Sequence, residues 1–345
     1  MTDRDKRTKI RHKLEAVQTQ ACSARTITDS LLEHIAGIAQ SCGAAAIFVY
    51  VDALDGNPIS LPENLKQKVY YVTKTIEEDR LQENRNTRFL RVPNVPLTRL
   101  GQVKVAVFLA LSRGLIKHGD TIVFLSGIAA SGNLDTIIVT EVGREYEMYA
   151  SVDTDHAPPS HILPEIVERV IDLASELGKE GREGKPVGAL FVVGDTDKVL
   201  PLTRQLILNP FRGYPEEQRN ILDESLEETV KELSALDGAF IVRGDGIIET
   251  CGVYLKTASQ DEFDLPRGLG ARHHAAAAIT SVTDSIAVTI SESTGTVTIF
   301  RAGRIMMEIE KPRTIGRKPV PSAVSDKGPS HTQSKSGPDK ISKKS

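Results

Sequence analysis

The chain has 345 residues, of which 40% are apolar and 26% charged, with a formal net charge of −3. This length and composition predict a globular protein of two domains and exclude a fibrous one. No apolar run approaches the roughly 18 residues of a membrane span, and the charged first residues do not resemble a signal peptide. Three scattered cysteines, Cys22, Cys42 and Cys251, form no disulfide framework. We therefore expect a cytoplasmic protein without membrane contact.

Charge is distributed unevenly along the chain. Residues 311–345 contain nine Lys+Arg and two Asp+Glu, hence a charge of +7, which leaves −10 on residues 1–310. Residues 312–345 are rich in Ser, Pro, Lys and Gly, and such a segment buries too little apolar surface to offset its ordering entropy. The sequence predicts a disordered basic tail. A solubilising terminus is favoured over an arm that binds polyanions.

The first elements predict an α/β domain over residues 25–145, after a charged segment, 1–24. Ile27, Leu31, Ile35 and Ile38 form one helical stripe. Helices are expected over 27–40 and 99–117, and strands over 44–51, 68–73, 121–125 and 136–142. Apolar strands that alternate with helices indicate a buried, mostly parallel sheet covered by helices.

A polar, glycine-containing connector is predicted over 146–186, and it includes a helical segment, 166–177. A second α/β domain is expected over 187–311. Its predicted strands are 188–195, 239–242, 252–255, 285–291, 296–302 and 304–310, with an acidic helix over 216–236 and a further helix over 273–283.

Polar residues gather at three expected element ends of the second domain. Asp237-Gly238 follows a helical stripe, where such a pair is most often a helix C-terminal turn. Two glycines, Gly268 and Gly270, lead into a helix that starts with Arg272, His273 and His274. Cations are unfavourable beside the N–H groups of a helix start unless an anion binds among them, which favours a phosphate site here. A solvated turn before a core helix is the alternative, and taken alone the two interpretations have equal weight.

The third place is the turn Ser291-Glu292-Ser293-Thr294-Gly295, which taken alone is most simply a polar hairpin. Strand ends and helix starts of one sheet are, however, where α/β folds build ligand sites. A hydroxyl, two carboxylates and an Arg-His pair together suit a nucleoside triphosphate with a divalent cation.

The motifs GALFVVGD, DGAFIV, GARHHAA and SESTGTVTIFRAG occur in this order over about 186–311. With them, the second domain resembles the diadenylate cyclase family, the catalytic domain of DNA-integrity scanning proteins. The resemblance implies an α/β domain with a central mixed sheet that condenses two ATP molecules into cyclic di-AMP and two pyrophosphates. It also implies Mn²⁺ or Mg²⁺ as cofactor and a face-to-face dimer of cyclase domains, and it allows a larger homo-oligomer.

By this resemblance Asp237 is the catalytic residue, which orients and helps deprotonate the ribose 3′-hydroxyl. The metal ligands would be Asp237, His273 and Glu292. The ATP-binding residues would be Gly238, Ala239, Leu255, Ala271, Arg272, His273, His274, Ser291 and Glu292.

Two positions depart from the family pattern, since His274 stands where the family usually has Arg and Ser293 where it usually has Glu. Histidine cannot form the bidentate fork of arginine, so we expect a changed ATP affinity or metal preference rather than loss of activity. The alternative function is a catalytically weak module that senses ATP or cyclic di-AMP.

Residues 25–145 resemble the C-terminal domain of pyruvate kinase in the segments HGDTIVFLSG, SGNLDT and TIIVTEVG. This pairing resembles the archaeal-type diadenylate cyclases. Subunit assembly is favoured over binding of a small anion as the role of this domain. No helix-hairpin-helix region follows the cyclase motifs, so no structured nucleic-acid binding is expected.

Overall fold

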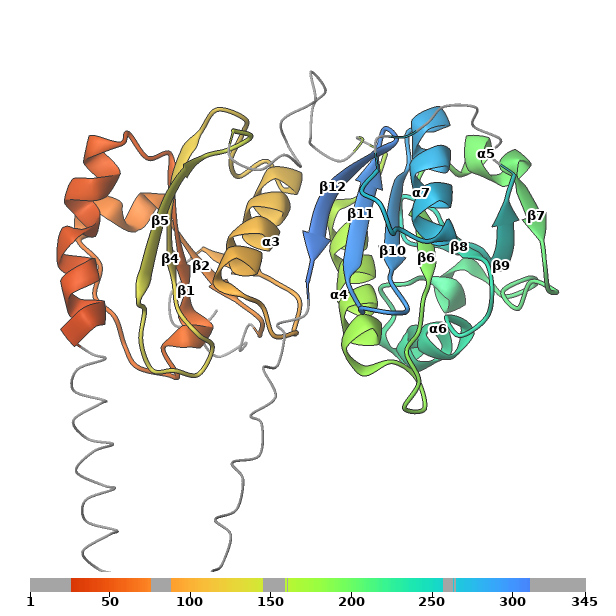
Figure 1. Ribbon diagram of the computed structural model, residues 1–345, viewed down its shortest axis with the longest axis horizontal. Coiled ribbons are helices and arrows are strands. Elements are labelled where there is room, and N and C mark those ends of the chain that lie inside the picture. The colour runs from red at the N-terminus through yellow and green to blue at the C-terminus, as the bar shows by residue number, and fades with distance from the viewer. Residues whose placement is uncertain are drawn as a thin grey trace, which may run out of the picture. The chain divides into compact units, whose positions relative to one another are not determined.

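The computed structural model describes residues 26–75, 88–144, 159, 161–256, 263 and 265–310. The predicted segment 1–24 and the predicted basic tail, 312–345, lie outside the described residues. The described strands form two sheets (Figure 1). Both sheets belong to one compact unit, so the division into two domains stays a prediction. In the described part of the chain, no helix has the length and apolar character that crossing a membrane requires.

The first sheet has five strands in the order β3-β2-β1-β4-β5. Their bounds are Ala46–Tyr50 (β1), Val69–Thr73 (β2), Phe89–Arg91 (β3), Thr121–Ser126 (β4) and Thr136–Glu141 (β5). β1 pairs in parallel with β2 and β4, β2 pairs in parallel with β3, and β4 and β5 are antiparallel. The prediction of a mostly parallel sheet here is confirmed, although β3 was not predicted.

Helical segments accompany this sheet. A helix covers residues 26–41, and α3 spans Arg99–Ser112. Short 3-10 helices are η1 (Val51–Ala53) and η2 (Glu63–Lys68). α3 ends five residues before its predicted end because Gly114 adopts a positive φ of 66°, which a helix cannot continue through.

The second sheet has seven strands in the order β12-β11-β10-β6-β8-β9-β7. Their bounds are Leu190–Val193 (β6), Thr203–Gln205 (β7), Ala239–Val242 (β8), Ile248–Leu255 (β9), Ile286–Ile290 (β10), Val297–Arg301 (β11) and Arg304–Ile309 (β12). β6 and β8 are parallel and the other named pairs antiparallel, as expected for a mixed sheet.

The second sheet is buried on both faces at β6. Successive residues of a strand point to opposite sides of the sheet, so each face can be followed along this strand. On β6, Phe191 and Val193 pack into one apolar cluster and Leu190 and Val192 into another. α4 (Pro164–Glu180) supplies the first cluster and α7 (Ala271–Val282) the second. These helices therefore cover opposite faces around β10 (Figure 1).

The prediction of one acidic helix over 216–236 is wrong in its extent, since only Glu227–Leu233 is α-helical. The segment contains η4 (Glu216–Arg219), η5 (Glu224–Leu226) and α6 (Glu227–Leu233). The Asn220 side-chain oxygen accepts a hydrogen bond from the Leu222 N–H, and the Asp223 carboxylate accepts one from the Ser225 N–H. Asn and Asp side chains that bond to nearby backbone in this way compete with helix formation. α5 (Thr196–Val199) and η3 (Leu200–Leu202), like β7, were not predicted.

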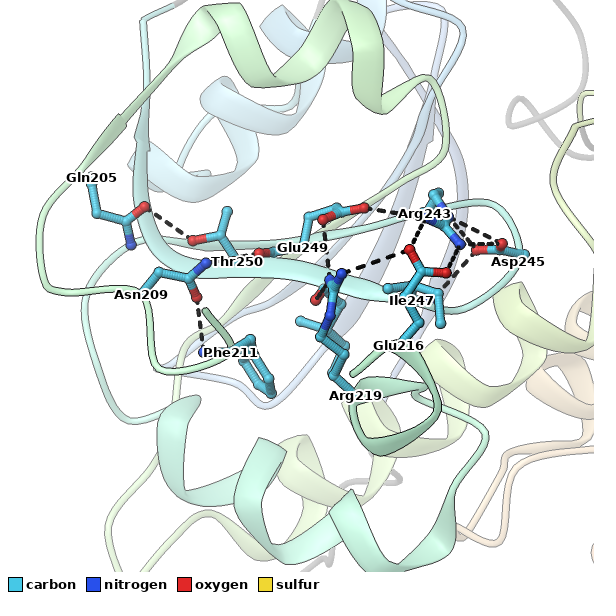
Figure 2. A network of polar contacts seen from close by, with 11 residues as sticks. Gln205, Asn209, Phe211, Glu216, Arg219, Arg243, Asp245, Ile247, Glu249 and Thr250 are labelled. Carbon is cyan, nitrogen blue, oxygen red and sulfur yellow. Dashed lines mark hydrogen bonds and ion pairs between the residues drawn. The ribbon is translucent and has the colours of Figure 1, made fainter. Parts of the chain in front are cut away.

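An ion-pair network holds this irregular segment to the turn between β8 and β9 (Figure 2). Arg243 forms two hydrogen bonds of 2.8 Å with the Glu216 carboxylate and also binds Asp245. Arg219 donates to the Ile248 carbonyl at 2.7 Å and to Glu249 at 3.1 Å. The network lies after the last residue of β8, whereas Asp237 lies before its first.

Candidate active site

Two cavities lie beside α7 and share Ala271 and Arg272. The first, here called the strand cavity, has a volume of about 840 Å³ and is lined by Leu190, Leu206, Asp237, Gly238, Ala239, Val253, Tyr254, Leu255, Phe263, Ala271, Arg272, His274, Ala275 and Ala278. The second, the loop cavity, has a volume of about 550 Å³ and is lined by Pro186, Gly268, Leu269, Gly270, Ala271, Arg272, His273, Ile290, Ser291, Glu292 and Ser293.

All ten predicted site residues line one or both of these cavities. Asp237, Gly238, Ala239, Leu255 and His274 line the strand cavity; His273, Ser291 and Glu292 line the loop cavity; Ala271 and Arg272 line both. The three places, which span residues 237–292 of the sequence, therefore come together at one site. The strand cavity has largely apolar walls, as base and sugar pockets do.

The position of Asp237 depends on the glycine that follows it. Gly238 has a φ of +109°, and a Cβ there would lie 2.6 Å from the Val253 backbone nitrogen. Only glycine therefore lets the start of β8 approach β9 this closely. The Asp237 side chain is 93% exposed and extends from this junction into the cavity mouth. A carboxylate held here can accept a proton or a hydrogen bond from a bound ligand.

Arg272 lies between the two predicted carboxylates. Its Nη2 is 3.4 Å from Asp237 Oδ1, and its Nη1 is 3.6 Å from Glu292 Oε2. These contacts are long for charge-assisted hydrogen bonds, which leaves the guanidinium able to exchange them for a phosphate.

Gly188, just before β6, makes room for Arg272 and had no predicted role. A Cβ on Gly188 would lie 2.8 Å from Arg272 Nη1 and 3.1 Å from Glu292 Cβ. The motif GALFVVGD contains this glycine, but the sequence carries no signal that a side chain from α7 crosses over it. Only the packing of α7 beside β6 makes the contact evident.

The adjacent histidines at the start of α7 have different surroundings. His273 is 4% exposed, contacts Phe300 edge-on, and its Nδ1 has no hydrogen-bond partner. Burial lowers the pKa of His273, and the neighbouring His274 and Arg272 lower it further. Its ring is therefore neutral at pH 7, with a nitrogen free to accept a bond. His274 is exposed and lines the other cavity.

The turn between β10 and β11 is the polar hairpin that its residues suggest. The Ser291 N–H donates to the Thr296 carbonyl, and the Gly295 N–H donates to the Ser291 carbonyl. The Ser291 and Ser293 hydroxyl oxygens are 3.3 Å apart. The structural and the ligand-binding interpretations are thus compatible, since this turn presents two hydroxyls and the Glu292 carboxylate to the loop cavity.

The three predicted metal ligands do not form a preformed coordination site. No group of three His, Cys, Asp or Glu side chains able to hold a metal occurs within the described ranges. Asp237 lines the strand cavity, whereas His273 and Glu292 line the loop cavity. The donor set fits an ion held mainly by substrate phosphates and one or two carboxylates, as is usual for Mg²⁺, rather than a resident ion.

Several cavity residues were missed by sequence reasoning. They are apolar or aromatic: Leu190, Leu206, Val253, Tyr254, Phe263, Ala275 and Ala278. The alanines follow Ala271 at helical spacing, and that spacing is the one signal that could have identified them. The strand residues are indistinguishable in sequence from core residues, because cavity and core share the same face of the sheet.

Two segments of the chain match known protein families. Residues 176–305 match the family described as DisA bacterial checkpoint controller nucleotide-binding. Residues 28–149 match the family described as probable sensor domain DacZ_P. The expected likeness of this first region to pyruvate kinase is not confirmed and stays a prediction.

Two relatives named as diadenylate cyclases are similar to this chain, and the second is covered far enough to show the family. The diadenylate cyclase of Methanocaldococcus jannaschii is 39% identical over 208 residues, which are 58% of this chain and 63% of that protein, so the match spans less than two thirds of that relative. The diadenylate cyclase of Haloferax volcanii is 35% identical over 214 residues, 61% of this chain and 75% of that protein. The chain belongs to the diadenylate cyclase family.

A solved structure gives a weaker match. DacA from Staphylococcus aureus, as a double mutant, is 23% identical and covers 41% of this chain and 84% of that chain. Its TM-score is 0.28, and a value this low carries no argument about the fold or the site.

Proposed function

We propose that this protein is a diadenylate cyclase that condenses two ATP molecules into cyclic di-AMP and two pyrophosphates. The observation that carries the proposal is the meeting of all ten expected site residues around two joined cavities. The strand cavity, with its apolar walls, would take base and ribose. The loop cavity, with Arg272, Ser291 and Glu292, would take the triphosphate.

Asp237 would act on the ribose. From the mouth of the strand cavity its carboxylate would accept the hydrogen bond of the 3′-hydroxyl and take up its proton as the hydroxyl attacks. The bond from O3′ to the α-phosphorus forms while the bond from that phosphorus to the leaving pyrophosphate oxygen breaks. Catalysis of this kind depends on positioning and charge neutralisation and needs no covalent intermediate.

Arg272 would leave its two carboxylate contacts and bind phosphate oxygens. The same guanidinium borders both cavities, so it would sit near the α-phosphate, where base and triphosphate compartments join. The N–H groups at the start of α7 would add to the binding of negative charge. Ser291 would donate a hydroxyl hydrogen bond to the same triphosphate.

The product requires a second copy of the site. Each chain contributes a single Asp237 and a single Arg272, which suits one nucleotide, whereas cyclic di-AMP needs two 3′-hydroxyls and two α-phosphates. We therefore propose that two copies face each other during the reaction, so that each hydroxyl attacks the phosphate held by the other copy.

Family members generally use a divalent ion, and Mn²⁺ or Mg²⁺ would here neutralise phosphate charge. Asp237 and Glu292 are the oxygen donors on either side of Arg272, and His273 is the imidazole that lines the loop cavity. These groups would contact an ion that arrives with the nucleotide.

The test is to incubate the purified chain with ATP and Mn²⁺ or Mg²⁺ and to resolve products by chromatography and mass. We expect cyclic di-AMP with two pyrophosphates per molecule formed, and a rate per chain that falls on dilution as copies separate. Unchanged ATP that still protects the protein from thermal unfolding would overturn the proposal in favour of the sensing module that His274 and Ser293 allow.

A further inference from the structure

We propose that Phe263 forms the end wall of the strand cavity and limits which substituents an adenine base can carry at its outer edge. The inference rests on the proposed function only in that the strand cavity holds the base. Phe263 belongs to none of the motifs that identify the site, and it lies in the stretch between β9 and α7.

The location of Phe263 follows from its neighbours. Its ring lies against Gly303, where an added Cβ would be 3.2 Å from the ring Cε1 and 3.0 Å from Ser281 Cβ. Ser281 is near the C-terminal end of α7, nine residues after Arg272, hence about 13 Å further along the helix axis. Phe263 therefore closes the end of the strand cavity that is distant from the loop cavity.

The hairpin turn between β11 and β12 keeps this ring in place. Ala302 and Gly303 both have positive φ values, 48° and 75°, as a tight two-residue turn requires. The Gly303 N–H donates to Thr280 Oγ1 at 3.2 Å, which ties the turn to α7. Since Gly303 has no side chain, the aromatic ring can fill the space above the turn. Phe263 and Leu265 then pack against the apolar cluster beneath α7.

The side wall formed by α7 carries Arg272 and His274 in its first turn and, beyond them, only small apolar side chains. Ala271, Ala275 and Ala278 follow one another on the cavity side of the helix. Between His274 and Phe263, α7 therefore adds no bulky group to the cavity wall. Tyr254, the other aromatic residue on this cavity, is 54% exposed and has the Arg204 guanidinium over its ring, so it borders the open side.

The orientation of the base in the strand cavity determines which edge of the purine faces the Phe263 ring. With phosphates at the start of α7 and the base deeper along the helix, the glycosidic nitrogen faces back toward Arg272. The opposite edge of the purine, with its 6-amino group, then faces the Phe263 ring. Position 8 of the purine lies next to the glycosidic bond and points elsewhere.

The experiment compares binding of ADP, N6-benzyl-ADP and 8-bromo-ADP to the full chain by calorimetry. Diphosphates lack the pyrophosphate leaving group, so binding is read independently of turnover. In the wild-type chain, N6-benzyl-ADP should bind far more weakly than ADP. In Phe263→Ala the benzyl analogue should gain about tenfold or more relative to ADP, while the ratio of 8-bromo-ADP to ADP stays unchanged.

Phe263→Leu, which keeps apolar packing with a smaller side chain, should give an intermediate gain. Phe89→Ala removes a half-buried ring from β3 and should leave both ratios unchanged. Equal gains for both analogues, no gain in Phe263→Ala, or a wild-type chain that binds no ADP would each overturn the inference. A chain that shows the predicted ratios yet forms no cyclic di-AMP would contradict the proposed function alone.

Discussion

One strand end of the first sheet and the site of the second sheet differ in how tightly their carboxylates are held. In the first sheet, Asp52 follows β1 and its carboxylate accepts hydrogen bonds from Thr73 Oγ1 at 2.7 Å and from the Lys74 N–H at 2.9 Å. In the second sheet, Asp237 and Glu292 are 93% and 64% exposed and contact Arg272 at 3.4 and 3.6 Å.

This difference separates polar groups that hold the fold from groups that can act on a ligand. Hydrogen-bonded carboxylates in the first sheet join loops to strands, and their loss leaves donors unsatisfied. Loosely paired, exposed charges beside a cavity contribute little to stability. The comparison predicts that substitutions at the second kind of residue change activity with little effect on folding, and that substitutions at the first kind do the reverse.

The largest effect is expected for Asp237→Asn. Turnover should fall by at least about 100-fold, because the amide cannot take the proton of the attacking hydroxyl. The melting temperature should stay unchanged, since the side chain is almost fully exposed. Rates of cyclic di-AMP formation and thermal melting together check this, and turnover within a few-fold of wild type would refute the role of Asp237.

Arg272→Ala should weaken ATP binding by about 10- to 100-fold, the worth of charge-assisted hydrogen bonds to a phosphate. Calorimetric dissociation constants measure the effect. Arg212→Ala removes an exposed arginine from the segment between β7 and β8 and serves as the control. Equal losses in both variants would indicate only a change in overall charge.

Gly188→Ala should weaken ATP binding several-fold, through Arg272. The new methyl group would lie 2.8 Å from Nη1, so the guanidinium must shift. Gly37→Ala places a methyl group in open space and is the matched control. The KM for ATP should rise more than kcat falls, and an unchanged KM would show that Arg272 accommodates the methyl group without cost.

Asp135→Asn tests the first sheet. The Arg99 guanidinium, which binds both oxygens of Asp135, lowers the pKa of this carboxyl. A lowered pKa in the folded state stabilises the protein above the unfolded value near 4, and that stabilisation is lost as pH falls through the folded pKa. At pH 7 the variant should therefore lose roughly 1 kcal/mol of unfolding free energy.

Denaturant unfolding of the wild type and of Asp135→Asn should converge as the pH drops below about 4, the range in which the wild-type carboxyl becomes neutral. ATP affinity should not change in this variant. A difference in stability that is independent of pH would place its cause in packing rather than in charge.

Arg243→Ala should have the smallest effect. The network around Arg243 joins Glu216 and Asp245 (Figure 2). It follows the last residue of β8, whereas Asp237 precedes the first. Its members are about half to one third exposed, so the loss of unfolding free energy should be about 1 kcal/mol or less. Unchanged ATP affinity is expected. A large loss of ATP affinity would mean that this network also positions Leu206, which lines the strand cavity.

Sequence patterns were sufficient to predict the positions of strands that have strong apolar runs. β10, β11 and β12 lie where they are predicted, because each is a short apolar run between turn residues. The single helix predicted over 216–236 was wrong in its extent. Its apolar spacing resembles a helix, but the Asn220 and Asp223 side chains accept hydrogen bonds from nearby backbone N–H groups. Whether such side chains face solvent or a neighbouring turn is a tertiary property.

The same division holds for the site. The sequence by itself determined which polar residue types are present and in which order, and the family resemblance that these motifs carry led to Asp237, Arg272 and Glu292. Only the tertiary structure decided that these meet around two cavities, that Gly188 makes room for Arg272, and that Phe263 closes the far end. The physical reason is that a cavity is bounded by side chains distant in sequence, whose separation depends on how α7 packs against the sheet.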